Sequence, residues 1–323
     1  MAESLGGERC PVCGARWWGA TERRLRYPAG LWRGFEAECR SCGALRAAGA
    51  SASAFEPELA ARLAGERYES RTDDPFAFSP YTLRIAASRR ARLVQPLDEA
   101  GRQALLHPHG EVAADARLAD YPQAAAPQAS LAILCREEEL HAVLAGVPAH
   151  GDWTDDVLVL VDGEGEARDR GILRLRYRRL GDDFSAQRNA AQAMARHPFV
   201  LQLDADETVG RGVRRLLRAL PEAAGEGVVS VGLPRKNFVE GERADLWPDV
   251  QYRLNRREVR FRGRVHERPA VDGWAWTAIA LTGAIRHQLT RAHVEGRSER
   301  YERIAPGEGR LFERRALLQP FRP

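Results

Sequence analysis

The chain has 323 residues, of which 44% are hydrophobic, and its 49 basic and 45 acidic side chains give a formal net charge of +4. This length and apolar content suffice for one large domain or two modest ones with a buried core. The mixed charge excludes the one-sided basicity of a dedicated nucleic-acid-binding protein, and no apolar run reaches the ~18 residues of a membrane-spanning helix. Because the first residues, MAESLGGERC, lack the basic start and apolar core of a secretion signal, we expect a cytoplasmic protein.

Two pairs of cysteines lie near the N-terminus, in Cys10-Pro-Val-Cys13-Gly14 and Cys39-Arg-Ser-Cys42-Gly43. In a reducing compartment, pairs at this spacing favour metal thiolates over disulfides, and four thiolates suit tetrahedral Zn²⁺. We therefore predict a small four-cysteine zinc ribbon over residues 1–50. With all four positions filled by sulfur, this zinc would be structural. Coincidental buried or redox-active cysteines are the alternative.

Residues 51–128 are rich in Ala, Arg and Leu, and they predict a helical connector and linker. Phe55–Arg67 and Tyr81–Val94 carry apolar residues near helical spacing. Tyr121–Gln128, with the sequence YPQAAAPQ, is interpreted as the linker because its prolines and small residues suit neither helix nor strand.

From Ser130 onward, strand-like and helix-like segments alternate. The strand-like runs are Ser130–Cys135, Asp156–Asp162, Ile172–Tyr177 and Phe199–Asp204; the helix-like ones are Glu137–Leu144 and Phe184–Arg196. This alternation predicts an α/β domain with a parallel sheet covered by helices on both faces. Ligands of such sheets gather beyond the carboxyl ends of the strands, where Asp162 and Asp204 both stand.

The segment Asp204-Ala205-Asp206-Glu207 follows a buried strand-like run. Carboxylates two residues apart can serve a nucleotide diphosphate in divided roles, in which one helps to hold the ribose and the other coordinates Mg²⁺ or Mn²⁺ on the phosphates. The alternative is a solvated helix N-terminus, where acidic residues suit the helix dipole.

Six segments, taken in order, carry a resemblance to a known family. They are CREEE (Cys135–Glu139), LVLVDG (Leu158–Gly163), FSAQRNAA (Phe184–Ala191), LQLDADE (Leu201–Glu207), LPRKNFVEG (Leu233–Gly241) and WPDVQYRLNRREVRFRGRVHE (Trp247–Glu267). Together they make residues 129–293 similar to family 2 glycosyltransferases of the GT-A fold, and to the bacterial subgroup of lipopolysaccharide core glucosyltransferases. The resemblance covers about half of the chain. It implies a Rossmann-like mixed sheet and a nucleotide-diphosphate sugar as donor.

The resemblance also implies a role for each candidate residue. The donor would be contacted by Asp162, Arg188, Asn189 and Asp204. The divalent cation would be bound by Asp206, assisted by Asp204 and with His287 as a further ligand. The catalytic base would be Asp249, with His266 and Glu267 as competitors. The reaction would be an inverting transfer to an acceptor hydroxyl. The structural alternatives are a turn aspartate for Asp162, a solvated helix face for Arg188 and Asn189, and a structural histidine for His287.

The resemblance further implies a glycan or lipid-linked acceptor and a role in cell-surface glycan or lipopolysaccharide assembly. Residues 294–323 are expected to form a charged C-terminal tail, which could contact the inner membrane peripherally, although a solvated charged helix is favoured. Two other interpretations stay open. Residues 136–137 and 164–166 differ from the family's donor loops, which allows a catalytically weak binding or scaffold protein. Trp17, Trp18, Arg23 and Arg24 allow a nucleic-acid-binding ribbon, although the mixed charge makes nucleic acid an unlikely partner.

Overall fold

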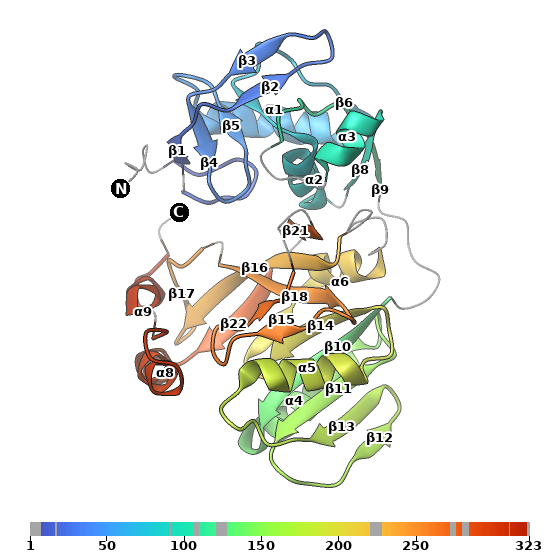
Figure 1. Cartoon of the computed structure of the whole chain (residues 1–323), viewed down its shortest axis with the longest axis vertical. Helices are drawn as coiled ribbons and strands as arrows, with labels where there is room; N and C mark the ends of the chain where they lie inside the picture. The colour runs from blue at the N-terminus through green and yellow to red at the C-terminus, as the bar shows by residue number, and fades with distance from the viewer. Residues whose placement is uncertain are drawn as a thin grey trace. The chain divides into compact units, whose positions relative to one another are not determined.

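The computed structural model describes residues 8–16, 18–90, 92–105, 110–120, 128–219, 228–247, 249–271, 276–279, 284–309 and 311–321. The chain divides into two compact units (Figure 1): unit 1 holds Met1–Pro122, Pro221–Val228 and Gly273–Thr282, and unit 2 holds Gln123–Leu220, Val229–Asp272 and Gly283–Pro323. The predicted linker lies outside the described residues, except for Gln128. Among the helices of the described ranges, none is long and apolar enough to cross a membrane.

Unit 1 combines short antiparallel strands with three helices in its described part. One sheet has the order β1 (Trp18–Ala20), β4 (Ala37–Cys39), β5 (Leu45–Arg46), β7 (Phe76–Ala77); β2 (Arg24–Arg26) pairs with β3 (Trp32–Gly34); and a third sheet has the order β6 (Arg67–Tyr68), β9 (Ala116–Asp120), β8 (Arg92–Pro96). The helices are α1 (Ala52–Ala64), α2 (Pro80–Ser88) and α3 (Glu99–Ala104), and β21 (Thr277–Ile279) belongs to this unit's range. Helix α2 begins as its sequence predicts, because Ser79 caps it and Pro80 supplies a compatible φ angle.

A single hydrophobic core joins the two intervals that the sequence separated at residue 50. The cysteine pairs are buried in the same cluster as Phe55 of α1, Phe76 of β7 and Leu118 of β9, and the rings of Phe55 and Phe76 stack with centroids 5.0 Å apart. The predicted helical segments of 51–128 are present in part as α1 and α2, but α2 ends at Ser88, residues 92–94 belong to β8, and the interval also supplies strands β6, β7 and β9. Their pairing is a tertiary effect that helical spacing alone did not reveal.

Unit 2 is built on a large mixed sheet, as the resemblance implied, and only part of it is the parallel sheet that the alternation predicted. Along the sheet, the order is β12 (Arg168–Arg170), β13 (Leu173–Tyr177), β11 (Val157–Asp162), β10 (Ala129–Arg136), β14 (Phe199–Asp204), β18 (Val250–Arg256), β16 (Ser230–Val239), β22 (Ile285–Leu289), β15 (Glu207–Val209), and β17 (Glu242–Arg243) pairs with β16. Strands β13, β11, β10 and β14 are mutually parallel, whereas β18 runs antiparallel to β14 and β16. A separate pair is formed by β19 (Phe261–Arg262) and β20 (Arg268–Pro269).

Helices of unit 2 pack against this sheet. They are α4 (Leu140–Gly146), flanked by 3₁₀ turns at Glu137–Glu139 and Val147–His150, then α5 (Phe184–Met194), α6 (Arg211–Arg218), α8 (Arg291–Ile304) and α9 (Leu311–Leu317). Helix α5, which crosses in front of the strands in Figure 1, buries Ala191 and Ala195 against Leu158, Leu160 and Val200. The predicted strands of 130–204 and helix α5 thus lie within a residue or two of their predicted positions, whereas α4 begins three residues late and β12 was not predicted.

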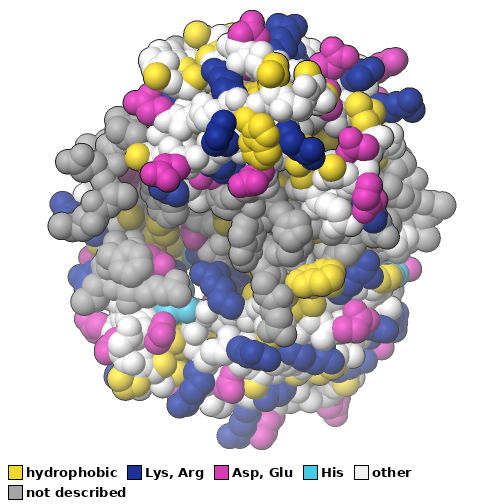
Figure 2. All heavy atoms as spheres, turned by 45° about the horizontal axis from the view of Figure 1, so that its top comes forward, with side chains coloured by type: hydrophobic (Ala, Val, Ile, Leu, Met, Phe, Trp, Pro, Cys, Tyr) yellow, Lys and Arg dark blue, Asp and Glu magenta, His cyan; other side chains and the backbone are white. Residues whose placement is uncertain are grey.

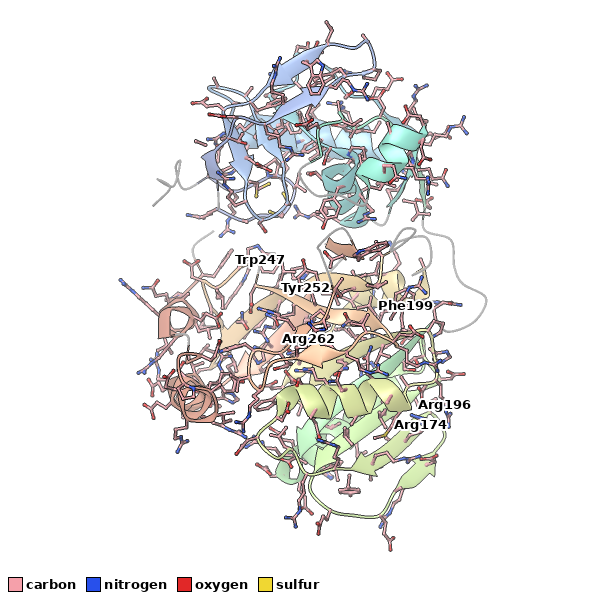
Figure 3. The ribbon with its side chains drawn as sticks, in the orientation of Figure 1. Arg174, Arg196, Phe199, Trp247, Tyr252 and Arg262 are labelled. Atoms are coloured by element: carbon pink, nitrogen blue, oxygen red, sulfur yellow. The ribbon has the colours of Figure 1, made fainter. Side chains whose placement is uncertain are left out.

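The amino ends of the parallel strands are held by a buried aspartate. The carboxylate of Asp156 accepts a hydrogen bond from the Ser130 hydroxyl at 2.6 Å and pairs with the Nε atoms of Arg174 at 2.9 Å and Arg196 at 3.8 Å; Figure 3 labels both arginines. Because these opposite charges are paired with one another, this end of the sheet has a structural role and leaves the opposite, carboxyl end for ligands.

The described part of 294–323 is helical, in line with the charged-helix alternative and not with a loose tail. Thr290 caps α8, and Val294 of α8 and Leu317 of α9 are buried with Val239 and Leu289 of the sheet. The sequence did not indicate this packing because charged residues dominate the two helices, and the few apolar positions that anchor them are widely spaced. Basic and acidic side chains are interspersed over the face drawn in Figure 2, in keeping with the balanced composition.

Candidate active site

A pocket of about 380 Å³ opens in unit 2, and strand register explains its position. Leu134 of β10 lies level with Asp204, and Arg136 lies level with Asp162, so β10, β11 and β14 end at the same edge of the sheet. Helix α8 contributes His293, Arg297 and Tyr301 to the lining. The pocket brings together most of the predicted site residues: Asp162, Arg188, Asp204, Asp206, Asp249, His266, Glu267 and His287.

Asp204 is held between two arginines. Its Oδ1 accepts from Nη2 of Arg188 at 2.8 Å, and its Oδ2 accepts from Nη2 of Arg253 at 2.6 Å. Arg188, on α5, is almost fully buried and also pairs with Glu267. Burial raises the pKa of Asp204 above that of an ordinary aspartate, against the lowering effect of Arg188. Since both oxygens accept from guanidinium groups, the ionised carboxylate is the form that fits these contacts.

The ion pairs continue beyond Arg253 toward Asp249. Arg253 lies 3.5 Å from Oε1 of Glu207, Arg235 donates to the same oxygen at 2.9 Å, and the Nε of Arg235 donates to Oδ2 of Asp249 at 2.8 Å. Acids and arginines therefore alternate from Glu267 through Asp204 and Glu207 to Asp249. We call these four carboxylates with Arg188, Arg253 and Arg235 the charge chain.

Asp249 keeps a low-pKa carboxylate at the end of the charge chain. Burial works to raise its pKa, but the charge of Arg235 and hydrogen bonds from Asn237, Arg235 and Gln251 lower it below the ordinary value. Its Oδ1 accepts from Gln251 at 2.7 Å. The backbone at Asp249 has a φ of 37° and that at His266 a φ of 50°, a region that non-glycine residues seldom occupy and that is often found at functional sites.

Asp206 and His287 form a second charged pair beside Asp204. The Nε2 of His287 lies 3.3 Å from Oδ2 of Asp206, and its Nδ1 lies 2.8 Å from Oδ1 of Asn237. Burial works to raise the pKa of Asp206, but the hydrogen bond and charge of His287 lower it overall. The register explains this meeting, since Glu207 of β15 and Asn237 of β16 both lie level with His287 on the intervening strand β22.

The other predicted residues, Asp162, Asn189 and His266, contact backbone groups of the protein through their side chains. Oδ1 of Asp162 accepts from the Leu180 amide at 2.8 Å, which makes it a turn aspartate at the pocket's edge. Asn189 does not line the pocket; its side chain donates to the Phe261 carbonyl at 3.0 Å and accepts from the Phe261 amide at 2.7 Å. His266 lines the pocket while its Nε2 contacts the Glu308 carbonyl at 2.7 Å.

Four residues of this network were not among the sequence candidates: Glu207, Arg235, Asn237 and Arg253. All four occur in quoted segments, and a period of two could have revealed them. Arg235 and Asn237 alternate along β16, and Asp249, Gln251 and Arg253 alternate along β18, so each set faces one side of the sheet. Polar residues at alternate positions of otherwise buried strands are a signal for an internal polar site.

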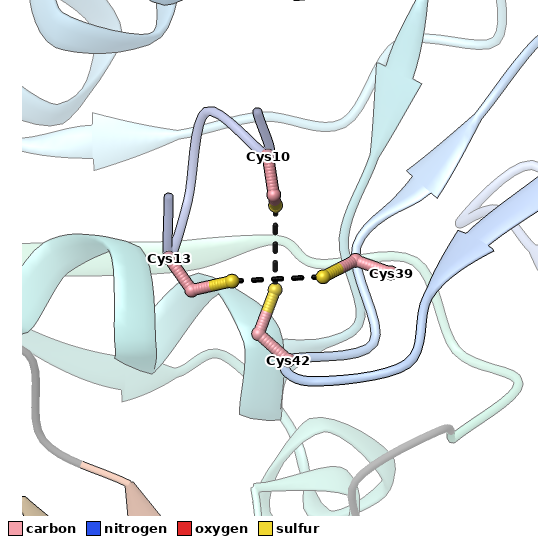
Figure 4. Close-up of side chains that lie close together, drawn as sticks. All are labelled: Cys10, Cys13, Cys39 and Cys42. Carbon is pink, nitrogen blue, oxygen red and sulfur yellow. Dashed lines mark hydrogen bonds between the residues drawn. The ribbon is translucent and has the colours of Figure 1, made fainter. Parts of the chain in front are cut away.

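The four N-terminal cysteines come together as predicted (Figure 4). The Sγ atoms of Cys10 and Cys42 are 3.6 Å apart, those of Cys13 and Cys39 are 3.5 Å apart, and all four lie within 4.8 Å of one another. A zinc–sulfur distance of about 2.3 Å in a tetrahedron places the sulfurs about 3.8 Å apart, close to this spacing. The four thiols form no disulfide, so the donor set fits Zn²⁺.

Each cysteine pair is shaped by a turn that ends on a glycine. The Gly14 amide donates to the Cys10 carbonyl and the Gly43 amide to the Cys39 carbonyl, both at 2.8 Å. The φ angles of these glycines are 74° and 77°, which favour glycine. Within the described residues, this is the one group of three or more His, Cys, Asp or Glu side chains close enough together to share an ion.

Two of the four residues that suggested nucleic-acid binding make contacts within the protein itself. Trp18 is buried, and the guanidinium of Arg23 donates to Glu38 at 2.7 Å and to the Gly110 carbonyl. Arg24 is exposed on β2, 5.9 Å from the ring of Trp32, while Trp17 lies outside the described residues.

No protein-family model matches this chain, and no curated protein sequence does either. Among solved structures, that of S. aureus TarS 1–349 is similar with a TM-score of 0.33 and 13% identity over 53% of this chain and 64% of that chain. The same protein in complex with UDP-GlcNAc gives 0.32 and 13% over 49% and 58%, and S. aureus TarS gives 0.30 and 14% over 53% and 38%. The match thus covers less than two thirds of each of those chains, and TM-scores this low leave the function to be inferred from the site.

Proposed function

We propose that unit 2 is a glycosyltransferase that uses a divalent cation and a nucleotide-diphosphate sugar. The observation that carries the proposal is the charge of the pocket floor. Within the described residues, Asp204, Glu207, Asp249 and Glu267 pair there with three arginines, and Asp206 pairs with His287. Among these side chains, five carboxylates thus face three guanidinium groups. A divalent cation would neutralise this excess.

The cation would be Mn²⁺ or Mg²⁺, held by Asp206 and His287. These ions are commonly bound by one or two side chains together with substrate phosphates, so a closed cage of protein ligands is not required. Both oxygens of Asp204 already accept from arginines. We therefore infer that Asp204 positions the site and leaves direct coordination to Asp206. When bound, the cation would neutralise charge on the leaving diphosphate.

Asp162 and Asp249 would act at the two ends of the donor sugar. Asp162 stands at the carboxyl end of β11, and its Oδ2 has no hydrogen bond within the described residues, so it can accept from the nucleoside. Oδ1 of Asp249 accepts one hydrogen bond and keeps a lone pair. In an inverting reaction, this carboxylate takes the acceptor's hydroxyl proton, the oxygen bonds to the anomeric carbon, and the bond to the nucleotide diphosphate breaks.

Donor binding tests the proposal directly. We expect one of a panel of UDP-, GDP- and dTDP-sugars to raise the unfolding temperature in the presence of Mn²⁺ and to have little effect without it. Asp206→Asn should weaken Mn²⁺ binding at least about tenfold, whereas the exposed control Asp169→Asn should bind as the wild type does. Failure of every donor to bind with Mn²⁺ would refute the proposal.

The assignment of the base has its own test. Asp249→Asn should abolish sugar transfer, followed by mass spectrometry of the product, while leaving donor affinity within about threefold of wild type. The variant keeps an oxygen that accepts from Arg235 but loses the proton acceptor. Full activity of Asp249→Asn would shift the role to His266 or Glu267, which share the pocket.

A binding or scaffold protein that has lost turnover is the second candidate. The occupied oxygens of Asp204 favour it, because an ion-paired carboxylate is less available to a cation. A donor that binds with Mn²⁺ but is neither hydrolysed nor transferred would identify this case.

For the active enzyme, we propose a glycan or lipid-linked acceptor in cell-surface glycan assembly, on the basis of the resemblance described above. We also propose a structural Zn²⁺ at the four cysteines of unit 1.

A further inference from the structure

Asn237 joins the two halves of the pocket floor without lining the pocket itself. Its side chain is almost fully buried on β16. Its Nδ2 donates to Oδ2 of Asp249 at 2.7 Å, and its Oδ1 lies 2.8 Å from Nδ1 of His287. This amide is therefore the direct link between the proposed base and the proposed cation site.

The orientation of the amide follows from its neighbours. Oδ2 of Asp249 already accepts from the Nε of Arg235, and a guanidinium can only donate. The Asn237 group that faces this oxygen must therefore be the NH₂, which also reaches the Leu246 carbonyl at 3.4 Å. The opposite orientation would set two acceptor oxygens against each other at 2.7 Å.

The orientation of the Asn237 amide in turn determines that Nδ1 of the His287 ring carries a hydrogen. Because the amide oxygen faces Nδ1, that nitrogen must carry the hydrogen. The other ring nitrogen, Nε2, faces Asp206 at 3.3 Å, and it is therefore the nitrogen that would exchange its hydrogen for a bound cation. A lone pair beside a carboxylate is the donor set that a divalent cation needs, and a hydrogen-bonded partner on the far nitrogen is the usual support for a metal-binding histidine.

We propose that Asn237 is a positioning residue that fixes the tautomer of His287, so that Nε2 and Asp206 can bind a divalent cation in register with Asp249. This inference rests on the proposed function for its purpose, but the tautomer belongs to the metal-free protein. This tautomer would be determined by the contacts among the side chains of Arg235, Asp249, Asn237 and His287, whether or not a sugar is transferred.

The tautomer can be measured without metal. Two-bond ¹H–¹⁵N spectra of the metal-free protein distinguish a ring nitrogen that carries a hydrogen from one with a lone pair, and His287→Gln identifies the signal. We expect a hydrogen on Nδ1, the nitrogen that faces the Asn237 oxygen. A lone pair on Nδ1 would overturn the inference even if the protein proves to transfer sugar. If the expected tautomer is found but no donor binds with Mn²⁺, the proposed function alone fails.

Variants then test whether the tautomer supports the cation. Asn237→Leu removes the acceptor for Nδ1 and should weaken Mn²⁺ binding by about 10- to 100-fold, measured from the electron paramagnetic resonance of free Mn²⁺. Folded Asn237→Leu protein with wild-type Mn²⁺ affinity would refute the role.

A matched control separates positioning from general stability. Asn255 is another buried asparagine of the same sheet, with contacts to Ser230 and to the Tyr252 carbonyl but to neither Asp206 nor His287. Asn255→Leu should lower the unfolding temperature and leave Mn²⁺ affinity unchanged. Equal losses of affinity in Asn237→Leu and Asn255→Leu would show that Asn237 acts through stability alone.

Discussion

Replacing Arg188 by methionine tests whether the charge chain holds the pocket floor together. The side chain of Arg188 is 2% exposed, and it pairs with Asp204 at 2.8 Å and with Glu267. Without Arg188, the carboxylates of Asp204 and Glu267 keep one cationic partner among the described residues. This partner is Arg253, which lies 2.6 Å from Asp204 and 3.7 Å from Glu267. Breaking a buried pair by removing one partner costs about 3 to 5 kcal/mol.

We expect the lower end of this range for Arg188→Met, about 3 kcal/mol or roughly 150-fold in the unfolding equilibrium, since Arg253 remains and Asp204 is 34% exposed. Urea unfolding with hydrogen exchange of the α5 and β14 amides measures the change within unit 2. Adding Glu267→Gln should recover about 1 kcal/mol or more, because one unpaired charge is removed. The exposed pair of Arg176 and Asp169 provides a control, and Arg176→Met should cost less than about 1 kcal/mol. A loss below about 1 kcal/mol in Arg188→Met would refute the reasoning.

Three further predictions concern the cysteines, their turns and acid stability. Freshly purified protein should contain one zinc ion per chain by mass spectrometry, and Cys39→Ser should lose both the zinc and the cooperative unfolding of unit 1; absence of zinc would remove the site. Gly43→Ala should destabilise unit 1 by about 1 kcal/mol because of its positive φ, and an unchanged unfolding temperature would contradict this. The lowered pKa of Asp249 means that its carboxylate stabilises the fold above the unfolded value of about 3.9, and that this contribution is lost as the pH falls further. Asp249→Asn should therefore lose stability less steeply below a pH of about 4, as measured by urea unfolding at several pH values.

Local patterns were enough to predict the scaffold of unit 2. The buried parallel strands β10, β11 and β14 are continuous apolar runs that end in charged residues, and α5 begins at a capping aspartate, Asp183. The cysteine pairs were equally local, because spacing and a following glycine specify the turn. In each case, the deciding interactions lie within a few residues along the chain.

Long-range pairing decided what the sequence did not reveal. Arg235, Asn237 and Arg253 lie in the site because β16 and β18 pair with each other and β22 pairs with β16, at a register that single-sequence patterns do not specify. The folding of α8 depends on a few apolar contacts made by Val294 rather than on an amphipathic pattern. Asn189 was assigned to the donor for its place beside Arg188, yet helix geometry points its side chain toward Phe261.

The charge chain divides the acids of the pocket floor into two classes. Asp204, Glu207 and Glu267 each contact at least one buried arginine, so their charges mainly hold α5, β16 and β18 in register. Among the described side chains, the Asp206 carboxylate pairs with His287 alone. Asp249 pairs with Arg235 through Oδ2 but keeps a free lone pair on Oδ1. A cation would therefore meet the acid that no arginine pairs with, and an acceptor hydroxyl would meet the oxygen of Asp249 that Arg235 leaves open. Asn237 lies between these two acids, and this arrangement predicts that cation affinity and proton acceptance depend on the same buried amide.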